Sequence, residues 1–199
     1  MSRSPIILIM LLFCFTGCRA QTSGNMIDTR TIDSFELESY LGTWYELARF
    51  DHSFERGLQG VTATYSIRRD GKIRVENQGY RGSLDGKKSR AIGKAKFNPN
   101  GKPGQLKVSF FLFFYGDYFI LELDPGYQWA IIGSSSDNFM WILSRTPQVE
   151  PDLREKFLTL IKQRGYDTGK LIWVDQPVTS TSPPNPLSQG RGEPVTSNQ

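Results

Sequence analysis

Few side chains in this sequence are of the types that carry out covalent or metal chemistry. The 199-residue chain has one histidine, His52, and two cysteines, Cys14 and Cys18. No Cys/His cluster has the spacing of a zinc site, no G-x-S-x-G elbow is present, and the glycines of residues 79–88 do not lead into a phosphate-binding helix. A single histidine in a loop is more often solvated or hydrogen-bonded than catalytic. The sequence therefore predicts a protein that is not an enzyme and needs no metal or cofactor.

One acidic residue is set among aromatic residues, in the stretch YLGTWYELARF at residues 40–50. Alternate side chains of a strand share a face. One face of this strand would then carry the residues Trp44, Glu46, Ala48 and Phe50. The opposite face is also partly apolar, whereas a strand between a core and water would alternate cleanly. This strand is therefore predicted to be partly buried on both faces.

The N-terminus has the pattern of a secretory signal. Residues 6–15 form a continuous apolar run that is too short for a transmembrane helix but typical of a signal h-region. The run ends in FTGC, which resembles the bacterial lipobox. That resemblance implies cleavage before Cys18, lipid attachment to it, and, because Arg19 follows, sorting to the outer membrane. Residues 1–17 are predicted to be the signal peptide and residues 18–34 a lipidated tether; the alternatives are an ordinary signal peptide, or a buried helix with an incidental cysteine.

The C-terminal residues 178–199 are rich in Pro, Ser, Thr and Gly and have few apolar side chains, so they are predicted to be a disordered tail. Residues 35–177 then form one domain. The whole chain is 38% hydrophobic and carries a net charge of +4. A charge this small and dispersed argues against nucleic acid as a partner, while it suits anionic headgroups or a membrane surface.

The domain is predicted to be all-β. Runs of alternating apolar and polar residues are separated by turn signals such as DG at 70–71 and PG at 125–126. The apolar period becomes helical over residues 151–164, and a short strand follows at 171–174. The eight main strands are predicted at residues 43–51, 61–69, 72–80, 89–97, 105–114, 118–124, 127–134 and 139–146. Eight consecutive antiparallel strands favour an up-and-down β-barrel, because closure leaves no exposed edges, with the one C-terminal helix packed outside.

Three blocks of the chain resemble the signatures of the lipocalin family, and in particular its bacterial lipoprotein branch related to apolipoprotein D. The matching residues are Gly42 and Trp44, then Asp124 and Tyr127, then Arg145, and the resemblance covers about residues 35–177. It implies that Arg145 lies across the ring of Trp44 at the closed end of the barrel, as a cation–π contact. It also implies that Glu46 points inward, where a buried carboxylate needs an arginine, a tyrosine hydroxyl or water beside it.

An eight-stranded barrel encloses room for one small ligand, and the apolar strand faces predict its lining. On the strand 105–114 the polar Lys107 and Ser109 indicate that the other face, including Leu112 and Phe114, points inward. The predicted ligand-binding residues are Glu46, Ala48, Phe50, Ala63, Tyr65, Val75, Val108, Phe110, Trp129 and Met140. The alternative is that these side chains fill a solid core.

The resemblance and the apolar lining together predict a lipid-anchored outer-membrane protein, facing the periplasm, that stores or transports fatty acids or lysophospholipids. The alternatives are a lipid-modifying enzyme on the same barrel and a structural envelope lipoprotein with a filled barrel. The aromatic run at residues 110–119 predicts uncovered apolar surface, which would fit a homodimer contact or an approach to a membrane.

Overall fold

The computed structural model describes residues 26–178. The predicted signal peptide, the predicted lipid attachment site Cys18 and all but the first residue of the predicted tail lie outside these residues. The helical elements are α1 (Leu37–Tyr40), α2 (Pro151–Gln163) and the 3-10 helix η1 (Thr168–Lys170). The strands are β1 (Gly42–Arg49), β2 (Leu58–Ile67), β3 (Ile73–Arg81), β4 (Lys88–Phe97), β5 (Gln105–Phe111), β6 (Phe114–Leu123), β7 (Trp129–Gly133), β8 (Met140–Ser144) and β9 (Ile172–Trp173).

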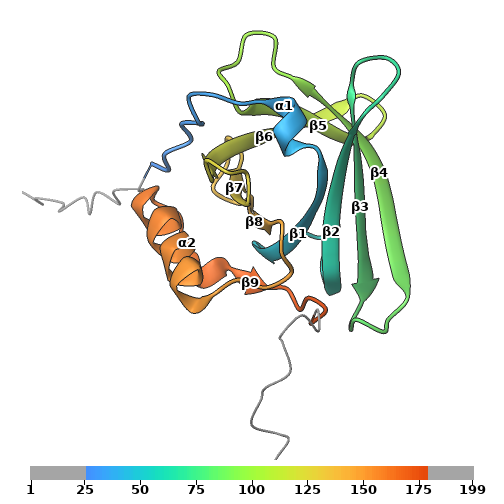
Figure 1. Ribbon diagram of the computed structural model, residues 1–199, viewed down its shortest axis with the longest axis vertical. Coiled ribbons are helices and arrows are strands. Elements are labelled where there is room, and N and C mark those ends of the chain that lie inside the picture. Colours follow the sequence, from blue (N-terminus) through green and yellow to red (C-terminus); the bar gives the residue numbers. More distant parts are fainter. Residues whose placement is uncertain (1–25, 179–199) are drawn as a thin grey trace, which may run out of the picture.

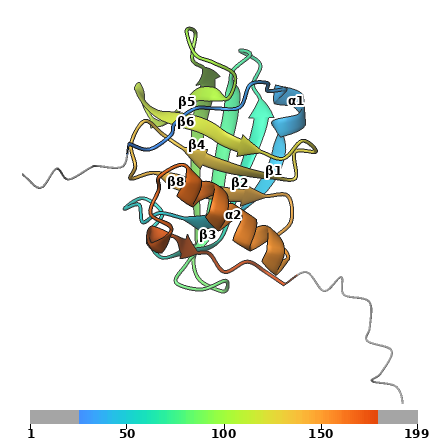
Figure 2. The ribbon, with the colours of Figure 1, turned by 90° about the vertical axis from the view of Figure 1, so that its left-hand side faces the viewer.

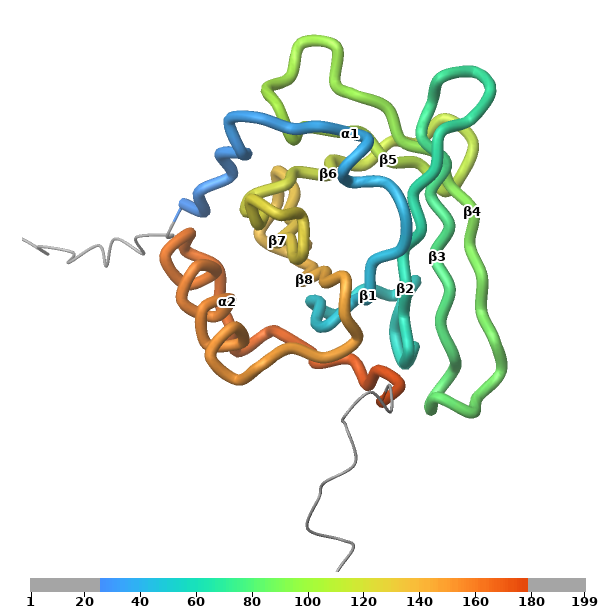
Figure 3. Tube along the Cα trace, viewed as in Figure 1, coloured from blue at the N-terminus to red at the C-terminus, as the bar shows by residue number. Residues whose placement is uncertain are grey.

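The strands form one antiparallel sheet that closes on itself. Its order is β2-β3-β4-β5-β6-β7-β8-β1-β9, and β1 also pairs with β2, so the eight long strands complete a barrel (Figure 1). The strands β2, β3 and β4 run side by side as its longest wall (Figure 3). The two residues of β9 pair with the end of β1. This arrangement confirms the predicted up-and-down barrel with one long helix outside.

Helix α2 covers part of the barrel's outer surface (Figure 2). It begins at Pro151, whose fixed φ suits a first helical turn, and ends just before Gly165, which has a φ of +84°. Its buried residues Phe157 and Ile161 pack with the outward side chains of β1, β7 and β8. The opposite faces of the same strands belong to the inner core. Strands β7 and β8 are therefore buried on both faces.

A β-bulge interrupts β1 and changes which side chains point inward. Glu46 pairs with Leu143 and Ala48 pairs with the preceding residue of β8, Ile142, so Leu47 has no counterpart. Such an extra residue shifts the alternation of the strand. Beyond the bulge it is Arg49 that lies on the inner side, next to Glu46, with a 2.7 Å contact between the two side chains.

The hairpin between β5 and β6 turns at Leu112 and Phe113, where Leu112 has a positive φ of 47°. The predicted strands 105–114 and 118–124 place a turn at residues 115–117. This placement is wrong, because these residues belong to β6 and Gly116 pairs with Val108. The predicted inward positions of Leu112 and Phe114 are wrong for the same reason: both side chains are exposed at the turn. A run of aromatic residues without glycine or proline gave no local signal for this turn.

Arg164, just after α2, fastens the segment that precedes α1 to the outside of the barrel. Its guanidinium donates hydrogen bonds to the backbone carbonyls of Asp28 and Arg30, at 3.2 and 2.8 Å. It also donates to the carbonyl of Leu121 on β6, at 2.6 Å, and to the carboxylate of Glu122, at 2.8 Å. One side chain thereby joins the N-terminal segment, α2 and β6.

Candidate functional site

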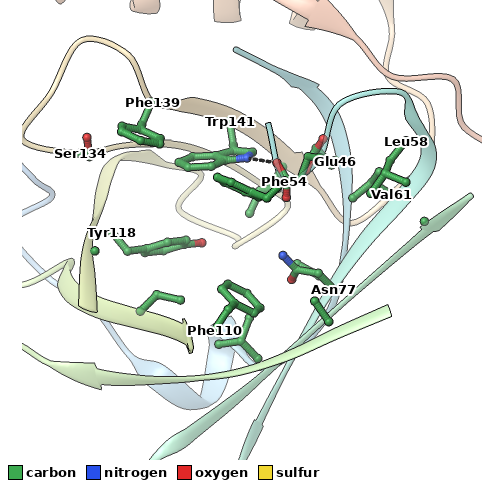
Figure 4. A pocket seen from close by; sticks show the side chains of 18 of the residues that line it. Glu46, Phe54, Leu58, Val61, Asn77, Phe110, Tyr118, Ser134, Phe139 and Trp141 are labelled. Atoms are coloured by element: carbon green, nitrogen blue, oxygen red, sulfur yellow. Dashed lines mark hydrogen bonds between the residues drawn. The ribbon is translucent and has the colours of Figure 1, made fainter. Parts of the chain in front are cut away.

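A cavity of about 660 Å³ lies inside the barrel (Figure 4). Its volume is within the range of small-molecule sites. Its walls are largely apolar, with a few polar groups from different strands. Six of the ten predicted ligand-binding residues line it, namely Glu46, Ala63, Tyr65, Val75, Val108 and Phe110. Lining residues that the sequence did not predict include Phe54, Glu55, Asn77, Tyr118, Phe139 and Trp141.

The exposed lining residues mark the mouth of the cavity. Phe54, Arg90, Phe110 and Ser135 are exposed, and they come from the β1–β2 loop, β4, β5 and the β7–β8 loop. The buried lining residues, such as Ala63, lie in the interior of the cavity. Pairing between β4 and β5 covers only the second half of β4. The first half of β4 pairs with β3 but not with β5, so it diverges from the β5–β6 hairpin at the mouth.

Four predicted lining residues lie outside the cavity. Ala48, Phe50, Trp129 and Met140 are buried in the cluster beneath α2. For Ala48 and Phe50 the reason is the bulge at Leu47, which reverses the alternation of β1. For Trp129 and Met140 the reason is that α2 covers their strands, so the outward faces of β7 and β8 are as apolar as the inward ones. Ile131 and Ile142 lie on the same outward side.

The closed end of the barrel is built around Trp44 and Arg145. The Arg145 guanidinium carbon lies 3.8 Å from the centre of the Trp44 ring, which confirms the predicted stack. Its two terminal nitrogens donate to the carbonyls of Ser39, Leu41 and Thr43, each at 2.9 Å. Such a cation–π contact stabilises by roughly 0.5–2 kcal/mol, depending on how far the cation is desolvated. The stack and its hydrogen bonds close the barrel below the cavity.

Gly42, Asp124 and Tyr127 shape the surroundings of this stack. Gly42 has a φ of +93°, a conformation that L-residues with a side chain rarely adopt. The Asp124 carboxylate accepts hydrogen bonds from the backbone N–H groups of Gly126 and Gln128, which fixes the β6–β7 turn. The Tyr127 hydroxyl accepts from the N–H of residue 36, and its carbonyl accepts from Arg145 Nε. All five residues of the predicted signature therefore lie at the closed end.

Three tyrosine hydroxyls meet on the cavity side of Trp44. The Tyr118 hydroxyl lies 2.7 Å from that of Tyr40 and 2.8 Å from that of Tyr65. The ring of Tyr40 lies 4.8 Å from the ring of Trp44, between centroids. Burial raises the pKa of all three phenols above their usual range. The bottom of the cavity therefore presents neutral hydroxyls that are already hydrogen-bonded to one another.

Two carboxyls line the cavity wall, Glu46 on β1 and Glu55 in the β1–β2 loop, and Glu46 forms a buried ion pair with Arg49. Arg49 donates to Glu46 Oε1 at 2.7 Å and to the backbone carbonyls of Glu55 and Leu58, at 2.9 and 3.1 Å. The Trp141 indole N–H donates to Glu55 Oε2 at 2.9 Å, which Figure 4 marks with a dashed line. Of the three partners expected beside Glu46, an arginine, a tyrosine hydroxyl or water, the structure places an arginine there, Arg49. Sequence alternation placed Arg49 on the opposite face, so only the bulge reveals the pair.

The two carboxyls are buried near a single arginine, which forms an ion pair with Glu46 alone. Burial, and then the negative charge of Glu55, raises the pKa of Glu46, while Arg49 opposes the shift. Burial also raises the pKa of Glu55, against its hydrogen bond from Trp141. Two carboxylates and one guanidinium would leave one uncompensated negative charge, which a low-dielectric wall disfavours. The pair therefore retains protons at pH values where free carboxyls lose them.

His52 is buried rather than solvated, and its Nε2 has no hydrogen-bond partner among the described residues. Its ring is stacked between Phe54 and Phe139, at centroid distances of 5.2 and 4.9 Å, and lies 4.7 Å from the ring of Trp141. Burial, and then the charge of Arg49, lowers its pKa from 6.5 to about 4. The expectation of a solvated or hydrogen-bonded histidine is wrong: His52 acts as a flat neutral ring in an aromatic group beside the mouth.

Within residues 26–178 no group of three or more His, Cys, Asp or Glu side chains is arranged to hold a metal ion. No helix in this part of the chain has the length and apolar character needed to cross a membrane. The site therefore consists of an apolar cavity, three tyrosine hydroxyls at its bottom and two carboxyls on its wall.

Comparison with known proteins places these features in a family. Residues 35–176 match the family described as "Lipocalin-like domain". The outer membrane lipoprotein Blc of Vibrio cholerae is 45% identical over 172 residues, which cover 86% of this chain and 98% of that protein. The outer membrane lipoprotein Blc of Escherichia coli K12 is 45% identical, over 83% of this chain and 92% of that protein. Apolipoprotein D of Mus musculus is 32% identical, over 72% and 78%.

Solved structures show the same fold at lower identity. Insecticyanin of the tobacco hornworm Manduca sexta superposes with a TM-score of 0.61 at 21% identity, over 76% of this chain and 86% of that chain. Lobster apocrustacyanin A1 gives a TM-score of 0.57 at 23% identity, over 71% and 79%. These likenesses support the barrel alone.

Proposed function

The chain belongs to the lipocalin-like family, and from that premise we propose that it binds a single-chain lipid, a fatty acid or a lysophospholipid, at the outer membrane of a bacterial cell. The observation that carries this proposal is the 660 Å³ cavity, which is open at one end and closed by the Trp44–Arg145 stack at the other. A cavity with mostly apolar walls and few polar groups suits an acyl chain. Each methylene transferred from water contributes roughly 0.8 kcal/mol before ordering costs.

The relatives support the location and the class of protein. Two of them are named outer membrane lipoproteins at 45% identity over most of the chain. We infer the same location here, with lipid on Cys18 as the anchor and the domain facing the periplasm. The relatives are named as lipoproteins or lipocalins, and we infer that the protein is a carrier that returns its ligand unchanged. Incubation with lysophospholipid, followed by mass analysis of the recovered lipid, tests this: a cleaved or modified product would refute it.

Binding can be followed through a native tryptophan. Trp141 lines the cavity, whereas Trp129 lies beneath α2, so Trp141 is the reporter. Titration with lysophospholipid and with fatty acid should saturate at one molecule per barrel. A two-chain phospholipid should bind poorly, since one barrel interior accommodates one small ligand. A Trp141→Phe variant should lose most of the signal while binding in a competition assay is kept.

Blocked variants test whether the ligand lies in the cavity. Ala63 and Val108 line it from different strands, so Ala63→Trp and Val108→Trp should each abolish saturable binding without unfolding the barrel. Ala130→Ser is a mild control at a fully buried position of the inner core that does not line the cavity. If both blocked variants fold and bind as tightly as the parent, the ligand binds elsewhere and the proposal fails.

A further inference from the structure

The turn between β5 and β6 carries a cluster of exposed apolar side chains. We call Phe111, Leu112, Phe113 and Phe114 the aromatic tip; their exposed fractions are 67, 60, 85 and 75%. Soluble proteins seldom leave four consecutive large apolar residues in water, and such a patch marks an interaction surface. The rings of Phe111, at the end of β5, and Phe114, at the start of β6, stack at 6.3 Å between centroids. This contact joins the two strand ends of the tip.

Basic side chains lie directly beside the aromatic tip. The ammonium group of Lys94 is 5.8 Å from the ring centre of Phe113 and 5.7 Å from that of Tyr115. The ammonium group of Lys96 is 4.6 Å from the ring centre of Tyr115. A combination of apolar side chains that can enter an acyl layer and cations that stay at headgroup level is typical of membrane-binding surfaces.

A small groove lies where these two features meet. Its volume is about 200 Å³, and it is lined by Arg68 and Lys94 together with Ile92 and residues 110–112. Arg68 also pairs with Asp70, at 3.1 Å, so its charge is partly compensated. Lys94 has no carboxylate partner within salt-bridge distance among the described residues. The groove therefore offers a basic recess next to an apolar projection.

The same surface is continuous with the cavity mouth. Phe110 lines both the groove and the main cavity. The tip is thus next to the opening through which a ligand would enter.

We propose that the aromatic tip inserts into the acyl layer of an anionic phospholipid bilayer, with Lys94, Lys96 and Arg68 at the level of the lipid phosphates. A second copy of the chain is a less suitable partner for the aromatic tip and its basic side chains. In a two-fold contact the same surface meets itself, so the basic groups of the two copies would lie close together and repel. A bilayer with anionic lipids complements both the apolar and the basic part. This docking is separate from any anchor on Cys18, and it does not depend on the identity of the cavity ligand.

The depth of the tip in a bilayer is the decisive measurement. The protein, purified from bacterial membranes as it is processed there, is reconstituted in vesicles of equal parts phosphatidylcholine and phosphatidylglycerol that carry bromine on their acyl chains. The variant Phe113→Trp adds one tryptophan to the four of the parent, and Phe114→Trp is the second variant. Ile172→Trp, at an exposed residue of β9, is the matched control. We expect the bromine to quench the added tryptophan at 113 or 114 but not at 172.

The basic groups are tested by charge removal. In the Phe113→Trp background, Lys94→Gln and Lys96→Gln should each lower the ratio of quenched to unquenched protein about fivefold in the anionic vesicles. Neither change should matter in pure phosphatidylcholine vesicles, and high salt should reproduce the loss. Equal quenching at 113, 114 and 172 would overturn the proposal. A second outcome would also overturn the proposal. If the emission of the tryptophan at 113 shifts to shorter wavelength as the protein concentration rises in the absence of vesicles, the aromatic tip contacts a second copy of the chain.

Discussion

Removal of Trp44 and Arg145, singly and together, tests whether the closed end acts as one coupled unit. Trp44 is fully buried, so Trp44→Ala should lower the free energy of unfolding by roughly 3–5 kcal/mol. Arg145→Ala removes hydrogen bonds to three carbonyls at the closed end. Hydrogen bonds to a charged group contribute roughly 1.5–3 kcal/mol each where buried, but two of these bonds are exposed, so the total loss should be about 2–4 kcal/mol.

The two losses should not add. Each single variant already removes the 3.8 Å cation–π contact, so the double variant should cost less than the sum by about 1–2 kcal/mol. Urea unfolding measures this, provided that the dependence on denaturant stays the same among the variants. The control is the surface pair Arg154 and Trp173, in which the guanidinium carbon is 3.5 Å from the ring centre. That pair is more exposed, so its coupling should be below about 1 kcal/mol. Additivity within about 0.3 kcal/mol at Trp44 and Arg145 would refute the reasoning.

Changing Cys18 to Ala should release the protein from the membrane fraction or leave it unprocessed; fractionation followed by mass analysis checks this, and unchanged retention would contradict the anchor. Burial raises the pKa of Glu46 above 4.5, so the folded state keeps a proton that the unfolded state loses, and stability should fall as pH rises from about 4.5 through the raised pKa. In the Glu46→Gln variant the urea midpoint of unfolding should fall less steeply with pH than in the parent. An unchanged slope would show that Glu46 does not cause the decline. The pKa of His52 is lowered to about 4 from 6.5, so stability should rise with pH between these values. His52→Phe, which keeps a stacked ring, should remove that rise, and its persistence would show that another group causes it.

The barrel was predictable because its strands leave clear local signals. In residues 61–69 apolar and polar side chains alternate, since one face of β2 meets the inner core and the other is more open to solvent. The DG turn at 70–71 joins β2 to β3, as expected. The closed end was also predictable, because Trp44 and Arg145 belong to signature blocks rather than to a periodic pattern. Both kinds of signal are local in the sequence.

The rest of the site depends on tertiary packing that no local pattern carries. The sequence predicts that Trp129 and Met140 point inward, yet α2 buries the outward face of their strands as fully as the barrel core buries the inward face. The apolar character of a strand face therefore does not distinguish inside from outside. The extra residue Leu47 is indistinguishable in sequence from an ordinary strand residue, although it brings Arg49 to Glu46. The turn at Leu112 is enforced by strand pairing rather than by turn residues.

The fastening of the N-terminal segment by Arg164 has a mechanical consequence. A pull on the chain from the side of Met26 reaches the bonds at Asp28 and Arg30 before it reaches β1. Through Arg164 the load passes to α2 and to the backbone of β6 at Leu121, where several bonds resist in parallel. Strand β1, which carries Glu46 and Arg49, is thereby shielded from tension. A protein tethered at this end would keep the shape of its cavity while the tether is stretched.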